Sequence, residues 1–219
     1  MTEPWWLLSS PPAGAACNMA LDETLLRFAV ARARPLLRVY SWNEPSVTFG
    51  YFQKFPHHLA ATHTVVRRPT GGGIVHHTAD PTYTVVVPPG HALHAMSTQD
   101  AYNLLHRAVS AALAQKSQIS NLKSPLRGGY ECFQHPVTGD VVASDGAKLA
   151  GGAQRRGKNG MLHQGSIAAK VSIEQLTTGF HQILHAAFTP YELTAEETAL
   201  AEKLAREKYA TNTWNKRIA

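Results

Sequence analysis

The sequence predicts an α+β fold. Runs of β-branched and other apolar residues recur as hairpin-like pairs around turn residues, and segments with helical spacing lie between them. A regular alternation of strand and helix, which would predict a parallel sheet, is not seen. The length of 219 residues fits a single domain, residues 1–219, without a separate accessory domain.

One helix and four strands are predicted in the first half of the chain. Residues 18–28 place apolar side chains at positions 19, 21, 25, 26 and 28, which is the spacing of one helical face. The strands are short apolar runs bounded by turn residues. They span 36–40 and 46–49 around the turn at 43–45, 65–68 before Pro69, and 82–87 before Pro88.

The second half is predicted to contain three helices and three strands. A long helix is expected over 97–115, because Ser97 can cap it and Asp100 lies in its first turn. Residues 118–129 are expected to be a flexible loop, since they contain serines, glycines and Pro125. Strands are predicted at 141–142, 148–150 and 161–169, and further helices at 172–178 and 194–208.

The charge balance favours an acidic partner. The chain has 21 lysines and arginines against 15 aspartates and glutamates, a net charge of +6, and a pI near 9.4. Nucleic acids, anionic metabolites and acidic protein domains all fit such a surface. The basic residues form no uninterrupted run, and no nucleic-acid-binding motif is present, so we expect no nucleic acid partner.

The cysteine count and the absence of long apolar runs predict a location. Cys17 and Cys132 are the only cysteines, which gives no disulfide framework and fits a reducing compartment. Residues 1–6 lack the basic region of a signal peptide, and no stretch reaches the roughly 18 apolar residues of a membrane span. We therefore expect a cytoplasmic monomer with no membrane contact.

Lys148 is the only ionisable residue in the small-residue run 146–153. Small neighbours let a ligand approach the backbone closely, and an ammonium there can meet an anion or a polarised carbonyl. The alternative is that Gly151 and Gly152 form only a turn or bulge with Lys148 on its solvated side.

A second segment, 67–77, joins two arginines to three consecutive glycines. The glycines present backbone N–H groups without side chains, which suits an anion, an oxyanion or a thin acyl chain. The spacing matches neither a Walker loop nor a dinucleotide fingerprint, and a glycine-rich hairpin is the alternative. The candidate binding residues here are Arg67, Arg68, Gly71, Gly72, Gly73 and His77.

Cys132 precedes the lysine segment and is a candidate nucleophile. A free thiol is about 3% thiolate at pH 7, and nearby cations raise that share. The alternative is a buried small apolar residue, which we expect for Cys17. Two cysteines without paired spacing predict no metal site.

Together these segments resemble the lipoate-protein ligase and octanoyltransferase family, also called the biotin/lipoate A/B protein ligase catalytic domain. Residues 67–72 with His77 resemble the first motif of the family, 148–154 the motif with its catalytic lysine, and 165–167 the third motif. Further segments match over most of the chain, at 18–23, 42–43, 50–53, 82–84, 190–193, 208–210 and 214–215. The resemblance implies a mixed, mostly antiparallel sheet flanked by helices.

Octanoyltransferases of the LipM type are the most similar members, because their nucleophile is the cysteine of a Cys-Phe segment ahead of the lysine motif. Cys132-Phe133 stands at that place, so the resemblance implies Cys132 and Lys148 as catalytic residues. It also implies substrate-binding roles for the residues named at 67–77 and for Gly151 and Gly165. An octanoyl or lipoyl group would pass from acyl carrier protein through a cysteine thioester to the lysine of a lipoyl domain or glycine-cleavage H protein, without a cofactor.

Two other functions stay open. Gly73 is more typical of the ATP-dependent lipoate ligases, which use ATP and Mg²⁺ to form a lipoyl-adenylate. In such a ligase Lys148 would bridge carboxylate and phosphate, with Arg67 or Arg68 holding the phosphate. Departures from the family pattern at Thr78, Ala147 and 163–164 instead favour a non-catalytic paralogue that binds a lipoyl domain.

Overall fold

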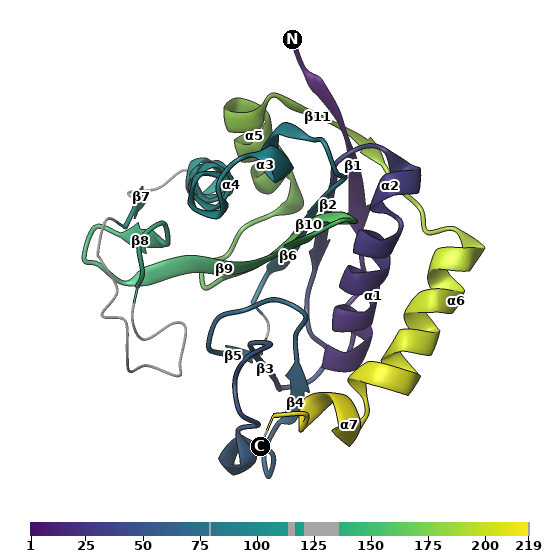
Figure 1. The fold of residues 1–219 in the computed structure, drawn as a ribbon. Coiled ribbons are helices and arrows are strands. Elements are labelled where there is room, and N and C mark those ends of the chain that lie inside the picture. Colours follow the sequence, from purple (N-terminus) through teal and green to yellow (C-terminus); the bar gives the residue numbers. More distant parts are fainter. Residues whose placement is uncertain (79, 114–116, 121–135, 219) are drawn as a thin grey trace.

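A mixed sheet forms the centre of the computed structural model, which describes residues 1–78, 80–113, 117–120 and 136–218 (Figure 1). In these residues eight strands follow the order β11-β1-β2-β6-β10-β9-β8-β7. The three strands β11, β1 and β2 pair in parallel, and each further pair is antiparallel. The bounds are β1 (Glu3–Ser9), β2 (Leu36–Tyr40), β6 (Thr82–Val87), β7 (Ser117–Ile119), β8 (Val141–Ala143), β9 (Lys148–Gly157), β10 (Gly160–Ile167) and β11 (Ala186–Pro190). The mixed, mostly antiparallel sheet is therefore confirmed.

A smaller sheet of three strands lies below the larger one in Figure 1. Its order is β4-β3-β5, with β3 (Ser46–Phe49) parallel to β4 (Thr64–Arg67) and antiparallel to β5 (Ile74–His77). The strands predicted on either side of the 43–45 turn, β2 and β3, thus belong to different sheets. The physical reason is that Val47 and Phe49 pack with Ile74 in a separate apolar cluster.

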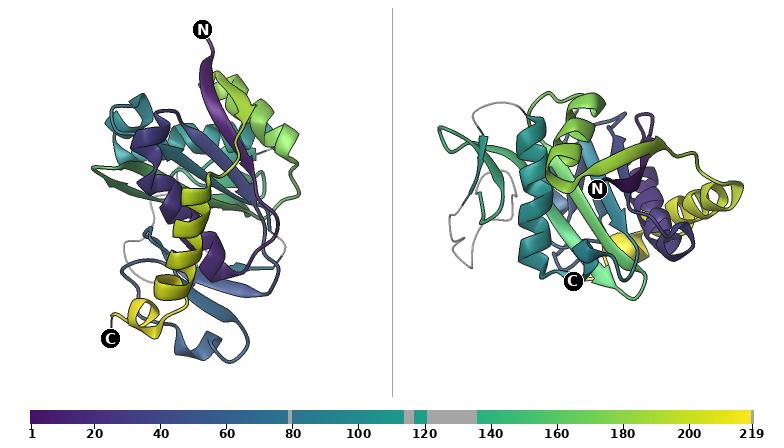
Figure 2. Two further views of the ribbon diagram at one scale, coloured as in Figure 1. Left: turned by 90° about the vertical axis from the view of Figure 1, so that its right-hand side faces the viewer. Right: turned by 90° about the horizontal axis from the view of Figure 1, so that it is seen from above.

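Helices cover both faces of the larger sheet (Figures 1 and 2). One face carries α4 (Thr98–Ala112) and α5 (Ile173–Leu184), and the other carries α1 (Ala15–Arg27) with α6 (Ala195–Leu204) outside it. The shorter helical segments are α2 (Ala29–Arg32), η1 (His57–Leu59), α3 (Ala92–Ala95), η2 (Ala205–Tyr209) and α7 (Asn212–Asn215). None of the described helices is long and apolar enough to cross a membrane.

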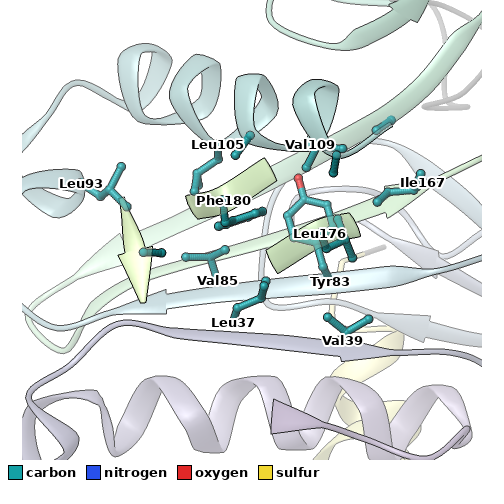
Figure 3. Packing of buried hydrophobic residues seen from close by; sticks show 14 of the residues in the cluster. Leu37, Val39, Tyr83, Val85, Leu93, Leu105, Val109, Ile167, Leu176 and Phe180 are labelled. Carbon is teal, nitrogen blue, oxygen red and sulfur yellow. The ribbon is translucent and has the colours of Figure 1, made fainter. Parts of the chain in front are cut away.

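The period of two in the strands sends successive side chains to opposite helical layers. Leu37 and Val85 pack under α4 and α5, where Leu105 and Phe180 meet them in the larger apolar cluster (Figure 3). Their neighbours on the opposite face belong to a second cluster with Leu25 of α1. Because β2 and β6 are buried on both faces, they appear in the sequence as almost continuous apolar runs.

Helix starts follow the sequence signals closely. The Ser97 side chain accepts a hydrogen bond from the Asp100 N–H, as predicted for the cap of α4. Capping boxes begin α5 at Ser172 and α6 at Thr194. The predicted helix at 172–178 continues to residue 184 because Leu176, Gly179 and Phe180 are buried against the core.

Three strands, β1, β5 and β11, and four short helical segments, α2, η1, α3 and α7, were not predicted from the sequence. Prolines caused two of these omissions, because Pro4 near the start of β1 and Pro190 at the end of β11 resemble turn residues. A proline is tolerated at a strand start or in an edge strand, where no ladder hydrogen bond is lost. Part of the predicted loop 118–129 is also strand, since residues 118–119 belong to β7, and 121–129 lie outside the described residues.

Gly179 provides a test of the helix packing that holds α5 on α4. A Cβ at this position would overlap the carbonyl oxygen of Ala108 and lie 2.6 Å from the Ala112 nitrogen. Gly179→Ala should therefore lower the free energy of unfolding by about 1–3 kcal/mol, although alanine favours helices. Urea unfolding followed by circular dichroism measures this change. The exposed Gln182→Ala on the same helix is the control, and equal stability of both variants would contradict the packing argument.

Candidate active site

Five of the predicted site residues line one cavity between the two sheets. They are Arg68, His77, Lys148, Gly151 and Gly165, and the cavity holds about 470 Å³ of empty space including its mouth. Apolar side chains complete the walls, among them Met19, Trp42 and Val75. The arrangement therefore combines apolar walls with a small number of cationic and polar groups.

Lys148 begins β9 and is buried, with only 5% of its side chain exposed. Its Nζ forms an ion pair of 2.7 Å with Asp140, whose side chain is fully buried. The lysine lies directly over Gly151, where a Cβ would overlap its Cε. The glycine beside the lysine is therefore a steric requirement for this side-chain position, which excludes the solvated turn as an explanation.

Asp140 is held by groups besides Lys148. Its carboxylate accepts hydrogen bonds from the Tyr102 hydroxyl at 2.7 Å and from the Val137 N–H at 2.8 Å. The Tyr102 oxygen in turn accepts the Gly152 N–H at 3.0 Å. Burial and the neighbouring Asp140 charge raise the pKa of Tyr102 well above its usual value, so the hydroxyl stays protonated and donates. Neither residue could be recognised from the sequence, because Asp140 and Tyr102 lie in separate segments without a motif.

His77 forms a fixed wall of the cavity. Its ring stacks on Trp42 with centroids 3.8 Å apart, and its nitrogens contact Asp80 at 2.9 Å and the Thr48 hydroxyl at 2.8 Å. Burial lowers the pKa of His77 in spite of the opposing effect of Asp80, so the ring is neutral at pH 7. Both nitrogens are occupied, which gives His77 a positioning role in this structure.

Asp80 supplies the carboxylate that the sequence seemed to lack. The family pattern places an aspartate directly after the histidine, where this chain has Thr78. In the structure the Asp80 carboxylate, two positions further along, contacts His77 and accepts a 2.6 Å hydrogen bond from Ser166. Burial raises the pKa of Asp80, but the hydrogen bonds from His77 and Ser166 outweigh it and leave the pKa lowered.

The two arginines of the first motif have different surroundings. Arg68 lines the cavity and also donates hydrogen bonds to the carbonyls of Gly71 and Gly73, at 2.7 and 2.8 Å. It therefore shapes the glycine loop. Gly72 has a φ of +85°, which only glycine adopts easily. The structure does not bring Gly71, Gly72 or Gly73 to the cavity wall, and their part in binding stays a prediction.

Arg67 does not line the cavity, although the sequence predicts that it binds substrate. Its guanidinium is buried and donates to the backbone carbonyls of residues 50, 51, 53, 214 and 215. These contacts attach α7 and the segment after β3 to β4. Arg67 ends β4 and Arg68 follows it directly. Successive side chains of an extended chain point to opposite sides, and only the register of β4 decides which arginine reaches the cavity.

Gln164 is a cavity residue that the sequence analysis named only as a departure from the family pattern. Its side chain donates to Asp22 at 2.7 Å and accepts from the Thr70 hydroxyl at 2.7 Å. It thereby joins α1, the glycine loop and β10. The neighbouring His163 points to the opposite face, where its Nε2 contacts the Tyr83 hydroxyl at 3.1 Å.

Gly152 and Gly165 border the cavity with backbone alone. A Cβ on Gly152 would lie 2.7 Å from the His163 ring, and one on Gly165 would overlap the ring of Tyr83. Both glycines therefore direct their missing side chains toward buried rings.

The structure shows the surroundings of only one of the two cysteines. Cys17 is exposed on α1, which corrects the expectation that it is buried. Its neighbours Asn18 and Met19 face inward instead, because the buried stripe of α1 passes through them. Cys132 lies outside the described residues, so its role as the nucleophile stays a prediction. Within the described part of the chain, no three His, Cys, Asp or Glu side chains are grouped to hold a metal ion.

This arrangement suits an electrophilic carbonyl that carries an apolar chain. The apolar walls offer a surface for such a chain, and the Lys148 ammonium lines the same cavity, where a cation can stabilise negative charge on an oxygen. The backbone of the glycines lets the chain pass close to β9 and β10.

Residues 15–208 match the family model of the lipoyl protein ligase A/B catalytic domain. Octanoyltransferase LipM of Geobacillus kaustophilus is 30% identical, and the match covers 97% of this chain and 98% of that protein. The protein of the same name from Brevibacillus brevis is also 30% identical, over 98% of this chain and 99% of its own length. The match to the one from Oceanobacillus iheyensis is 35% identical over 80% of this chain and 68% of that protein.

Solved structures of the same fold include two lipoate ligases. A putative lipoate protein ligase from T. acidophilum, with bound lipoic acid, superimposes with a TM-score of 0.78 and 23% identity over 100% of both chains. A lipoate-protein ligase A bound with ATP gives a TM-score of 0.76 at 23% identity, over 98% of each chain. At this level of identity the likeness shows the fold.

The hydrogen bonds of the Arg67 guanidinium predict that this residue stabilises the fold. Arg67→Lys removes most of the hydrogen bonds to the five carbonyls and leaves them buried without donors, so the free energy of unfolding should fall by about 2–4 kcal/mol. Urea unfolding measures the change. The control is Arg217→Lys, because Arg217 is exposed and its guanidinium lies over the ring of Tyr51, one of the residues whose carbonyls Arg67 bonds. If Arg67→Lys is as stable as the wild type, the structural role of Arg67 is contradicted, and a role in ligand binding becomes the better explanation.

The buried histidines predict that the stability of the protein depends on pH. Burial lowers the pKa of His106 from 6.5 to about 4, and His163 shifts in the same direction. Between these pH values the unfolded chain binds a proton that folded His106 does not, so stability falls as the pH falls from 6.5 to 4. The loss from His106 is about 3 kcal/mol. His106→Gln should flatten this slope in urea titrations, and an unchanged slope would contradict the assignment.

Proposed function

This chain belongs to the lipoyl protein ligase A/B catalytic domain family, and we propose that it is an octanoyltransferase of protein lipoylation. The observation that carries the proposal is the near full-length match, at 30% identity, to proteins named octanoyltransferase LipM. The cavity supports it, because a lysine and apolar walls meet there around backbone glycines.

The proposed donor is octanoyl-acyl carrier protein, and the proposed acceptor is the lysine of a lipoyl domain or glycine-cleavage H protein. Carrier and lipoyl domains are generally acidic, and the net charge of +6 on this chain complements them. No cofactor is needed, because the energy of the amide bond comes from the donor thioester.

Two steps complete the transfer. The Cys132 thiolate attacks the carbonyl carbon of the donor thioester, the C–S bond to the carrier breaks, and the carrier thiol leaves with a proton. The acceptor amine then attacks the octanoyl-cysteine thioester and forms the amide, while the Cys132 thiolate is released and the amine loses a proton. Each step passes through an oxyanion on the acyl oxygen.

Lys148 is the group proposed to stabilise that oxyanion. An ammonium carries three N–H groups, so one can stay with Asp140 while another turns to the acyl oxygen. In a site largely removed from water such a donor contributes about 3–4 kcal/mol to lowering the barrier. The octanoyl chain would extend along Met19, Trp42 and Val75.

An ATP-dependent lipoate ligase is the second candidate, favoured by Gly73. That activity would need ATP and Mg²⁺, with an arginine on the phosphate. Arg67 does not fit this task, because its guanidinium is bound to five backbone carbonyls. Arg68 is partly committed to the glycine loop as well. The non-catalytic alternative loses one of its supports, since Asp80 replaces the aspartate missing at position 78.

Intact mass spectrometry after incubation with octanoyl-acyl carrier protein tests the transferase. The wild type should gain the mass of one octanoyl group, which hydroxylamine removes, and Cys132→Ser should gain none. Lys148→Ala should form the acyl-enzyme about 10²–10³-fold more slowly, because the oxyanion loses its donor. Lys158→Ala, an exposed lysine just after β9, is the matched control.

Three outcomes would contradict parts of this proposal. A mass gain that survives Cys132→Ser would exclude the cysteine as nucleophile. No mass gain in the wild type would exclude the transferase. Lipoate-dependent release of pyrophosphate from ATP and Mg²⁺, without any octanoyl transfer, would establish the ligase instead.

A further inference from the structure

We propose that Tyr102 and Asp140 are positioning residues for the transfer reaction and that together they set the place of the Lys148 ammonium. The inference rests on the proposed function, because it assigns Lys148 a reacting oxygen. Neither residue lines the cavity. They act from behind the lysine, through the buried network described above.

The contacts leave Asp140 little freedom. One carboxylate oxygen accepts the Tyr102 hydroxyl at 2.7 Å, while the other meets Lys148 Nζ at 2.7 Å and the Val137 N–H at 2.8 Å. The hydroxyl therefore fixes which oxygen faces the lysine. Since the Asp140 side chain is fully buried, rotation of the carboxylate would break these bonds without water to replace them.

Tyr102 also fixes the strand that carries the lysine. Its oxygen accepts the Gly152 N–H at 3.0 Å, four residues along β9 from Lys148. Pairing between β8 and β9 reaches only Ala150, with an irregularity at Val141 and Val142. The Tyr102 hydroxyl therefore holds β9 beyond the end of its pairing with β8, in the part of β9 that borders the cavity.

The turn before β8 is built to deliver Asp140 to this position. Gly139 has a φ of +93°, and a Cβ there would lie 2.7 Å from the Tyr102 ring and 2.6 Å from the Asn103 side chain. The Gly139 carbonyl contacts His106 Nδ1 at 2.6 Å, and the Tyr102 and His106 rings are 4.0 Å apart. One face of α4 therefore holds both the turn and the carboxylate.

The expected consequence is kinetic, because displacement of a catalytic group by about 1 Å can lower a rate about 10²-fold. Without the Tyr102 hydroxyl, the Asp140 oxygen that it bonds is left buried without a donor, and the carboxylate leaves the orientation that holds Lys148. Without the Asp140 charge, the ammonium loses the ion pair with this carboxylate. Both changes should slow chemistry more than they weaken substrate binding.

The chain offers a matched control in Tyr209. It is also a buried tyrosine whose hydroxyl donates to a carboxylate, that of Glu23, which pairs with Lys208. Both sites join a tyrosine, a carboxylate and a lysine, but Tyr209 and its partners lie outside the cavity lining. Tyr209→Phe therefore removes an equivalent hydroxyl and should affect stability alone.

The experiment compares Tyr102→Phe, Asp140→Asn and Tyr209→Phe in the full chain, with two readouts. The first is kcat and KM for octanoyl transfer, where kcat should fall about tenfold in Tyr102→Phe and about 10²-fold in Asp140→Asn, with KM little changed. The second is the rate at which sulfosuccinimidyl acetate acetylates Lys148, followed by peptide mass spectrometry. Acetylation should be at least fivefold faster in both variants than in Tyr209→Phe and the wild type.

The two readouts separate the two proposals. A wild type that transfers no octanoyl group overturns the proposed function, while the acetylation rates still decide the positioning roles. Wild-type kcat and acetylation in Tyr102→Phe would overturn the role of the hydroxyl. Should Tyr102→Phe not fold, wild-type values in Asp140→Asn would overturn the inference equally. Melting temperatures show whether any loss follows stability instead.

Discussion

The ion pair between Lys148 and Asp140 is buried, and the structure around it follows from that constraint. Two charges taken out of water lose several kcal/mol of hydration each, and their mutual attraction compensates only when further hydrogen bonds complete the site. The Tyr102 hydroxyl and a backbone N–H provide these bonds to Asp140. The same requirement places a left-handed glycine in the turn and a tyrosine on α4, so the helix, the turn and β9 are specified together.

A similar arrangement surrounds a second buried carboxylate, Asp22. Asp22 pairs with Arg38 at 2.7 Å and also accepts hydrogen bonds from Thr84 and Gln164. Each member of that group comes from a different element, so the polar contacts join α1 to the sheet as the apolar clusters do. Removal of one member of such a network strongly destabilises the protein, and the complete network specifies a single arrangement of the elements. The cavity lies where two of these networks meet, one at Asp22 and one at Asp140.

A site of this kind gives Lys148, the lysine proposed to act in catalysis, a fixed place. Arg68 shapes the glycine loop, His77 is held between Asp80 and Thr48, and glycines of β9 and β10 form part of the surface. The wall is therefore held by its own hydrogen bonds at these positions. This agrees with chemistry that depends on the stabilisation of one developing charge, because preorganised donors need no rearrangement during the reaction.

Local patterns in the sequence predicted most of the central strands, the capped start of α4 and the Lys148 segment. These features depend on neighbours within a few residues, such as a Ser97 cap or a run of small residues beside a lysine. The resemblance of separated motifs to one family also came from sequence alone. What remained open was which of two adjacent side chains points inward.

Only the tertiary structure decided the pairings across distance. Arg67 and Arg68 are equivalent in the sequence, but the register of β4 gives one to the C-terminal helix and the other to the cavity. Tyr102 and Asp140 lie 38 positions apart, and no periodicity relates them. Their meeting depends on how α4 packs on the sheet. A chain folds its elements from local preferences, but the contacts that hold a buried charge form only when those elements are assembled.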